Sequence, residues 1–387
     1  MSLSTKEYVV KMRQKFHSVP EVSMEEKMTS AIIKEELEKW GVAYETVGDY
    51  GVVACIEGKF SGKTYAFRAD IDALPIQENT NLPYASTNPG VMHACGHDGH
   101  TAILLAFAKE LIAIKEQLKG KFYLCFQQGE EIGKGHELMI DYLKKAGDIE
   151  AVISSHLWID IPVGKISLRP GAVMAGTTSF NITIKGKGCH GSRPDQGTDP
   201  INAGATLIGQ AFSLKDREFS PMQSNTLSFC KFHSGNATNI IPEEATIGGT
   251  IRFFSAEERA CLLSVIDRSC KATELLTGCK IDWNTIVGLP PVINSDKYLE
   301  LAKISAETVF GTQNVIIFDK IMGADNIGCY LQEFGGVYAF IGIGNESKGL
   351  CNAHHNDKFN MDEDALALAV EFYLDFIEKN AKENNYV

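Results

Sequence analysis

The chain has 387 residues, of which 44 % are hydrophobic and 22 % charged, and its formal net charge at pH 7 is −12. This length and composition are typical of a folded protein of two domains, and they exclude a disordered or collagen-like chain. The acidic charge balance argues against nucleic acid as the main partner, and the longest apolar run, Ala102–Ala108, is too short to span a membrane.

The first 175 residues alternate between helical and strand-like segments. A capping box formed by Ser23 and Glu26 is predicted to open a helix that ends near Trp40, with Gly41 just after its end. The later segments are strands at Gly51–Glu57 and Lys63–Ala69, a helix at Thr101–Lys115, a strand at Lys121–Gln127, a helix at Gly135–Ala146 and a strand at Ala151–Leu157. This alternation predicts an α/β domain with a mostly parallel sheet covered by helices.

The pattern changes near residue 176. Thr178–Lys185 alternates polar and apolar residues, as a half-buried strand does. The segments after it are a helix at Pro200–Leu214, strands at Asn225–Phe232 and Ala245–Phe254, a helix at Ala256–Thr277 and a strand at Lys280–Val287. This β-α-β-β-α-β order is that of the ferredoxin-like unit.

Beyond Pro290 and Pro291 the alternation of helices and strands resumes. The expected segments are Asp296–Gly311, Val315–Asp319, Gly323–Phe334, Val337–Ile343 and Asp362–Lys379. We therefore predict one α/β domain, residues 1–175 and 289–387, interrupted by a small inserted α/β domain, residues 176–288.

The cysteines and the first residues indicate the compartment. None of the ten cysteines forms a C-x-x-C pair, and Met1–Met12 carries polar residues throughout, without a signal-peptide core. Reduced thiols in a cytoplasmic protein are the expectation.

The densest polar cluster is His93–His100, which contains three histidines, Cys95 and Asp98 just before a predicted helix. Cysteine and histidine both bind divalent metals such as Zn²⁺. A single histidine there would more often be structural, but a cluster of this density favours a metal site at a strand-to-helix turn.

Three more polar groups follow predicted strands of the same domain. They are the carboxylate pair Glu130–Glu131, His156, and the pair His354–His355. Each alone is more often a solvated turn or a structural histidine. In a largely parallel sheet the loops after the strands meet at one edge, so the groups are expected to converge there. One carboxylate of the pair could then bind metal while the other acts as a general base.

Other motifs are weaker. Gly188–Pro194 and Asn239–Pro242, in the inserted domain, are ordinary turns when taken alone. Gly58–Thr64 resembles a P-loop but has one residue too few between its glycines, and the chain has no Gly-x-Ser-x-Gly. Nucleotide hydrolysis and serine-hydrolase chemistry therefore have little support.

Taken together, these residues resemble the M20 metallopeptidases, in particular their aminoacylase/amidohydrolase branch. The motifs that carry the resemblance are Arg68–Pro75, His93–His100, Glu130–Glu131, His156, Gly188–Pro194, Asn239–Pro242, Met322–Gly323 and His355 ahead of Phe359 and Asp362–Glu363. The resemblance spans nearly the whole chain.

The resemblance implies a catalytic domain with an inserted lid that also mediates dimerisation. It implies two divalent metal ions per subunit, drawn from Zn²⁺, Mn²⁺, Co²⁺ and Ni²⁺. The implied metal ligands are Cys95, His97, Glu131, His156 and His355.

The same resemblance implies roles for five further residues. Glu130 would be the general base, and Asp70 a second catalytic residue. His190, with Asn239, would polarise the substrate carbonyl, in its own or the partner's site, and Arg252 would bind a substrate carboxylate. The expected reaction is hydrolysis of the amide bond of an N-acyl amino acid, with a short peptide as the other small-molecule substrate.

The sequence departs from the usual motifs of the family at several positions. Gly129 replaces an alanine and Gln128 a proline before the carboxylate pair, and the family's Ser-Glu-Asp becomes Ala324-Asp325-Asn326. Asp357 replaces a proline after His355. We expect these positions to border the pocket. A dipeptidase or carboxypeptidase on the same scaffold is the alternative function, and a non-catalytic metal-binding protein is the third.

Overall fold

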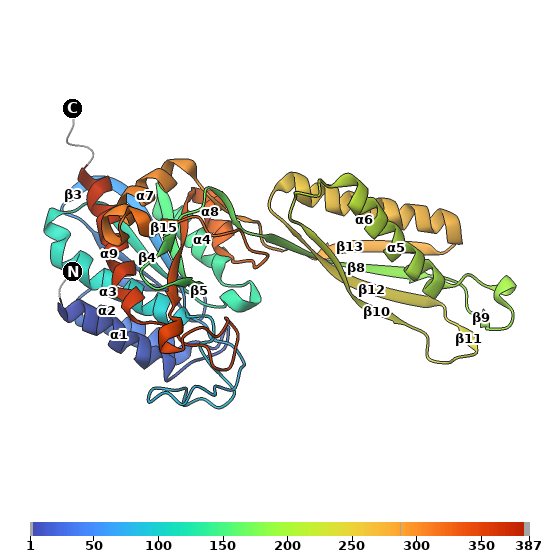
Figure 1. The fold of residues 1–387 in the computed structure, drawn as a ribbon, viewed down its shortest axis with the longest axis horizontal. Coiled ribbons are helices and arrows are strands. Elements are labelled where there is room, and N and C mark those ends of the chain that lie inside the picture. Colours follow the sequence, from blue (N-terminus) through green and yellow to red (C-terminus); the bar gives the residue numbers. More distant parts are fainter. Residues whose placement is uncertain (1–2, 287, 383–387) are drawn as a thin grey trace. The chain divides into compact units, whose positions relative to one another are not determined.

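A computed structural model describes residues 3–286 and 288–382; Val287, the last residue of the predicted strand Lys280–Val287, lies outside them. The chain divides into two compact units (Figure 1). Unit 1 comprises Met1–Val173, Val292–Lys320 and Asp325–Val387, and unit 2 comprises Met174–Pro291 and Ile321–Ala324.

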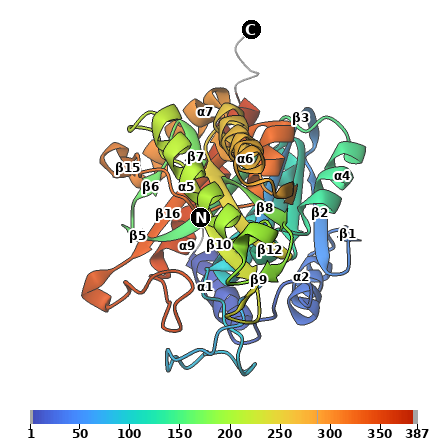
Figure 2. The ribbon, with the colours of Figure 1, turned by 90° about the vertical axis from the view of Figure 1, so that its right-hand side faces the viewer.

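Unit 1 is built on a mixed sheet of eight strands in the order β1-β2-β4-β3-β5-β16-β6-β15. The strands are β1 (Tyr44–Val47), β2 (Gly51–Glu57), β3 (Phe60–Asp70), β4 (Lys119–Gln127), β5 (Ala151–Pro162), β6 (Ile166–Ser167), β15 (Val315–Ile316) and β16 (Gly336–Gly344). The four central strands β4, β3, β5 and β16 are parallel to their neighbours within that group. Figure 2 shows β1 and β2 at one side of this sheet and β6 and β15 at the other.

Helices cover both faces of this sheet. They are α1 (Leu3–His17), α2 (Lys27–Lys39), α3 (His97–Ile114), α4 (His136–Ala146), α7 (Asp296–Phe310), α8 (Ile327–Phe334) and α9 (Asp364–Lys382). Eight consecutive residues of β16 are buried, on both sides of the strand. Val337, Ala339 and Ile341 join the core of α1, α3 and α9, while Tyr338 and Phe340 are buried on the other face. The predicted α/β class with a mostly parallel, helix-covered sheet is confirmed.

Unit 2 contains an antiparallel sheet of four strands in the order β10-β12-β8-β13. Its elements are β8 (Gly176–Lys185), α5 (Pro200–Glu218), β10 (Thr226–Ser234), β12 (Glu244–Phe253), α6 (Ala256–Thr277) and β13 (Lys280–Ile286). Figure 1 shows both helices over one face of this sheet, where Phe180, Leu207 and Ile266 are fully buried. The chain order of these elements is β-α-β-β-α-β.

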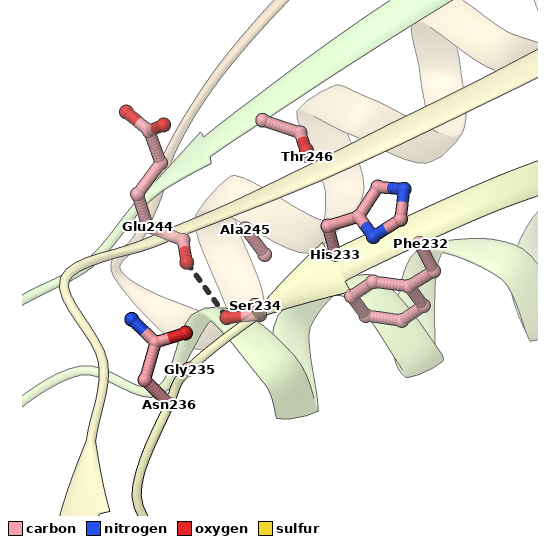
Figure 3. A pocket seen from close by; sticks show the side chains of 8 residues that line it. All are labelled: Phe232, His233, Ser234, Gly235, Asn236, Glu244, Ala245 and Thr246. Atoms are coloured by element: carbon pink, nitrogen blue, oxygen red, sulfur yellow. Dashed lines mark hydrogen bonds between the residues drawn. The ribbon is translucent and has the colours of Figure 1, made fainter.

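Two further two-stranded sheets connect short segments. β9 (Cys189–His190) pairs with β11 (Ile240–Ile241), and β7 (Gly171–Met174) pairs with β14 (Val292–Asn294). Unit 2 also has a pocket of about 420 Å³ along β10 and β12 (Figure 3). His233, Ser234, Asn236 and Glu244 give it a polar lining, which holds none of the predicted site residues.

Several predicted boundaries are wrong. The capping box is not formed, because α2 begins at Lys27 and Glu26 makes no side-chain cap. Gly41 does follow the helix with a φ of +66°, as predicted. Helix α1 was not predicted, and α3 begins four residues early, so that His97 and His100 lie in its first turn. His156 lies inside β5, which extends to Pro162 because its burial continues past the predicted end.

Candidate metal centre

The N-terminus of α3 brings two predicted metal ligands together. Gly96 is the N-cap of the helix and has a φ of +89°, a conformation that glycine adopts without strain. Cys95 therefore precedes the helix while His97 occupies its first turn. His97 is 1 % exposed, and the helix behind it is buried along most of its length.

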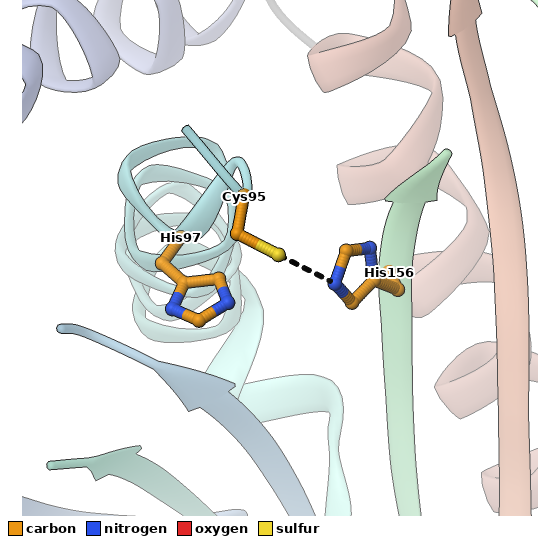
Figure 4. Close-up of side chains that lie close together, drawn as sticks. All are labelled: Cys95, His97 and His156. Atoms are coloured by element: carbon orange, nitrogen blue, oxygen red, sulfur yellow. Dashed lines mark hydrogen bonds between the residues drawn. The ribbon is translucent and has the colours of Figure 1, made fainter. Parts of the chain in front are cut away.

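Hydrogen bonds fix the orientation of two imidazole rings. Nδ1 of His97 donates to the backbone carbonyl of Asp72 at 2.9 Å, and Nδ1 of His156 donates to the carbonyl of Leu157 at 2.8 Å. In the neutral form of each ring, this bond leaves Nε2 unprotonated and available to a cation. Figure 4 shows Nε2 of His156 facing the Cys95 sulfur, 3.7 Å away.

The carboxylate pair follows β4 on a tight turn. Gly129 has a φ of +70°, and Glu130 and Glu131 begin a short 3₁₀ helix. Oε1 of Glu131 lies 3.8 Å from Nε2 of His97, and Oε2 lies 3.6 Å from Nε2 of His355. His355 has a φ of +62°, a strained conformation for a residue other than glycine and one that is concentrated at functional sites.

The donors form overlapping groups in which the ligand atoms lie within 4.8 Å of one another. The groups are Cys95–His97–His156, Cys95–Glu131–His355 and His97–Glu130–Glu131. Oε1 of Glu131 is buried and has no hydrogen-bond partner among the described residues. A thiol, imidazoles and carboxylates together with an unpaired buried oxygen fit borderline-soft divalent cations.

A fourth group, Asp70–His97–His100, also has suitable spacing. In His100, however, Nδ1 donates to Asp70 at 2.6 Å and Nε2 accepts from the backbone N–H of Leu157 at 3.0 Å. Both ring nitrogens are therefore used within the protein. In His354, Nε2 donates to the carbonyl of Leu157 at 3.0 Å, whereas Nε2 of His355 lies 3.6 Å from Glu131.

Glu130 lies next to this group with a distinct environment. Burial raises the pKa of its carboxyl well above the usual range, Asp325 adds to the rise, and Arg68 opposes it. Its Oε1 accepts from the backbone N–H of Asn326 at 3.3 Å. A carboxylate with a raised pKa beside metal ligands is suited to take up a proton.

Asp70 is held by neighbours at both carboxylate oxygens. Oδ1 accepts from His100, and Oδ2 accepts from Arg68 at 2.6 Å. Burial opposes its ionisation, but the charges of His97 and Arg68 outweigh that effect and hold the pKa of Asp70 well below its usual range. Asp70 thus has the geometry of a residue that positions its neighbours.

The departures from the family motifs lie behind the site. Asp325 and Asn326 are 3 % and 0 % exposed. Oδ1 of Asn326 accepts from Arg68 at 2.6 Å, and Asp325 accepts from Tyr338 at 2.5 Å. Both side chains are buried in a network around Arg68, while the backbone N–H of Asn326 contacts Glu130.

Two structural features of the site were not predicted. Asp72 holds His97 and also accepts from the backbone N–H of Glu131 at 3.0 Å. The buried guanidinium of Arg13, in α1, contacts Asp98 at 2.8 Å, and Asp98 also accepts from His17 at 2.7 Å. Asp72 stood in the Arg68–Pro75 motif, but nothing in the sequence pointed to Arg13.

Unit 2 holds the other three predicted residues. The pairing of β9 with β11 brings His190 and Asn239 together, with Gly191 N–H donating to the Asn239 carbonyl at 2.8 Å. Nδ1 of His190 accepts from the backbone N–H of Ser192 at 3.1 Å, which leaves Nε2 as the protonated nitrogen of the exposed neutral ring. The half-buried guanidinium of Arg252 makes no hydrogen bond or ion pair with the residues that the structure describes, and burial lowers its pKa.

Comparison with known proteins places the chain among characterised sequences. The profile of peptidase family M20/M25/M40 matches residues 66–379. An N-acetyl-L-cysteine deacetylase of Bacillus subtilis is 36 % identical over 379 residues, covering 96 % of this chain and 88 % of that protein. Thermostable carboxypeptidase 1 of Saccharolobus solfataricus is 36 % identical over 368 residues, covering 94 % of this chain and 92 % of the carboxypeptidase.

A solved structure agrees with these matches. A dinuclear metal-binding peptidase of the M20 family from Bacillus subtilis superposes with a TM-score of 0.87 at 30 % identity. The match covers 98 % of this chain and 99 % of that one. Among the described residues, no helix is long and apolar enough to cross a membrane.

Proposed function

Since the chain belongs to peptidase family M20/M25/M40, whose members are metal-dependent amidohydrolases and peptidases, we propose that it hydrolyses the amide bond of N-acyl amino acids. The observation that carries this proposal is the position of Glu130, whose carboxylate lies with His97 and Glu131 among the converging donors and is held by the backbone N–H of Asn326. A protein that only bound metal would not need such a base. The similarity to a deacetylase over nearly the whole chain supports the substrate class.

The proposed metal ligands are Cys95, His97, Glu131, His156 and His355, which would hold two divalent cations. When bound, such cations lower the pKa of water and polarise a carbonyl oxygen. The hydrogen bonds from His97 and His156 to backbone carbonyls support their assignment, because they leave Nε2 of His97 near Glu131 and Nε2 of His156 near the Cys95 sulfur. The metal content of the purified protein, measured by mass spectrometry, tests the assignment; fewer than two ions per chain after loading would contradict it.

The protein residues divide the remaining work. Glu130 takes the proton of the attacking water and returns it to the leaving amine. His190, through its protonated Nε2, donates to the oxygen of the substrate carbonyl, with Asn239 beside it, and Arg252 binds the substrate carboxylate. Asp70 fixes His100 and Arg68 in place.

The test is a hydrolysis screen on protein loaded separately with Zn²⁺, Mn²⁺, Co²⁺ and Ni²⁺. N-acetyl and N-benzoyl amino acids are offered beside free dipeptides, and Glu130→Ala is measured in parallel. We expect turnover of the N-acylated compounds that is lost in the variant. Turnover of dipeptides alone would favour the second candidate, a dipeptidase or carboxypeptidase, which the similarity to a carboxypeptidase supports.

We further propose that unit 2 acts as a lid and forms a homodimer, and that the protein works in the cytoplasm. The support is the family membership, together with thiols for which no disulfide forms among the described residues. Sedimentation of the wild-type protein tests the homodimer, since a monomer at micromolar concentration would contradict it. Cell fractionation tests the cytoplasmic location.

A further inference from the structure

The turn Glu21–Glu26 contacts the residues that carry the carboxylate pair. Oε1 of Glu26 accepts from the backbone N–H of Gly129 at 2.8 Å and from that of Met24 at 2.9 Å. Gly129 directly precedes Glu130. One carboxylate thus ties the turn before α2 to the turn after β4, although the two are 103 residues apart in the chain.

Glu26 is buried at a cost in free energy. Its side chain is 0 % exposed, and Oε2 has no hydrogen-bond partner within residues 3–286 and 288–382. Burial raises the pKa of its carboxyl to about 7. A buried carboxyl with an unpaired oxygen lowers the stability of the fold. Its presence here therefore indicates a role for the other contacts of Glu26.

A second contact joins the same turn to the other side of the carboxylate pair. Ser23 Oγ donates to Oδ2 of Asp72 at 2.6 Å, and the same oxygen accepts from the backbone N–H of Glu131 at 3.0 Å. The turn is itself anchored, because Ala73 N–H donates to the carbonyl of Glu21 at 2.8 Å. The backbone of Gly129–Glu131 is therefore held at both ends.

The packing is tight at Gly129. A Cβ atom at this position would lie 2.8 Å from Sδ of Met24, closer than real Cβ contacts allow. Its φ of +70° is also a conformation that other residues adopt with strain. A larger residue here would have to displace the Met24 side chain and adopt this φ with strain.

We propose that Glu26 is a positioning residue: its Oε1, by accepting from Gly129, fixes the backbone that presents the carboxylates of Glu130 and Glu131. The importance of those two carboxylates rests on the proposed function. Glu26 touches no substrate and acts only through the turn. The acceptor atom and its position, rather than its charge, are what the turn requires.

Three variants separate these requirements. Glu26→Gln keeps the acceptor in place, Glu26→Asp keeps the carboxyl but withdraws it by one methylene, and Glu25→Gln is the control at the exposed neighbour. The measurements are the Kd for Zn²⁺ by chelator competition, kcat and KM for N-acyl amino acids, and hydrogen exchange of the Gly129 amide.

We expect Glu26→Asp to weaken Zn²⁺ binding and lower kcat by about 10- to 100-fold each, the usual effect of losing a residue that orients metal ligands. KM should change little, Glu26→Gln should restore both quantities, and Glu25→Gln should match the wild type. Equal values for Glu26→Asp and the wild type, or an equal loss in Glu26→Gln, would overturn the proposal.

Two outcomes need separate treatment. If the wild type binds Zn²⁺ but hydrolyses none of the amides, the proposed function fails, while the order of Zn²⁺ Kd values still tests Glu26. If Glu26→Asp does not fold, exchange in the wild type decides. Protection of the Gly129 amide supports the proposal, and exchange at the rate of a free peptide overturns it.

Discussion

Asp72 holds the imidazole of His97: Nδ1 of the ring lies 2.9 Å from the backbone carbonyl oxygen of Asp72 and 3.2 Å from its Oδ1. The other carboxylate oxygen of Asp72 accepts from the backbone N–H of Glu131. One aspartate thus orients two proposed metal ligands from different elements, α3 and the turn after β4. Loss of the Asp72 side chain should therefore weaken metal binding more than it lowers the stability of the fold.

We predict that Asp72→Ala weakens Zn²⁺ binding by about 10- to 100-fold, because residues that orient metal ligands contribute affinity of that order. Chelator competition measures the Kd, with the exposed Asp49→Ala as the control. An unchanged Kd would show that the ligands keep their orientation without Asp72.

Glu130→Gln should abolish turnover and leave the metal content unchanged. The amide keeps the size of the side chain but cannot accept the proton of the attacking water. Steady-state assays and metal analysis of the same sample check this. Activity within a few-fold of the wild type would remove Glu130 from the role of base.

Replacement of His190 should affect the chemical step alone. His190→Ala removes a donor to the developing oxyanion, so kcat should fall by about 10²- to 10³-fold while metal content stays the same. His233→Ala, an exposed histidine of the same unit, is the control. Loss of metal in His190→Ala would instead identify a ligand.

Arg252→Ala should raise KM for substrates with a free carboxylate by about 10- to 100-fold, since a hydrogen bond to a charged group contributes about 1.5–3 kcal/mol. Substrates whose carboxylate is blocked as an amide should be unaffected. Assays on matched acid and amide pairs separate the two cases, with the exposed Arg217→Ala as control. An equal change for both members of a pair would contradict carboxylate binding.

The pH dependence of stability should report on Glu26. Burial raises the pKa of its carboxyl from an unfolded value of 4.5 to about 7, so the folded chain binds more protons between these values. Stability conferred by the protonated carboxyl is present below pH 4.5 and falls as the pH rises toward 7. The unfolding free energy of Glu26→Gln relative to the wild type should therefore increase from pH 5 to pH 7.5, as denaturant titrations would show. A constant difference would mean that the pKa of Glu26 does not shift on folding.

Much of the fold followed from local patterns. The alternation in Thr178–Lys185 and the apolar residues of Ala151–Leu157 each predicted a strand, because burial on one or both faces imposes its pattern on the sequence. The starts of helices α2 and α3 did not follow from such patterns. Ser23 and Glu26 have the spacing of a capping box, yet both side chains bond to residues far along the chain.

The sequence by itself determined the class of the fold and the kinds of side chain at the site. Cys95, His97 and Glu131 stand in motifs rich in metal-binding residue types, and such a combination seldom has a purely structural role. Only the tertiary structure decided which nitrogen of each histidine is free, because Asp72 and Leu157 provide the fixing carbonyls. It also decided that Asp325, Asn326 and Glu26 are buried partners of the site. Hydrogen bonds between distant segments depend on how strands and loops pack, and no local spacing encodes that.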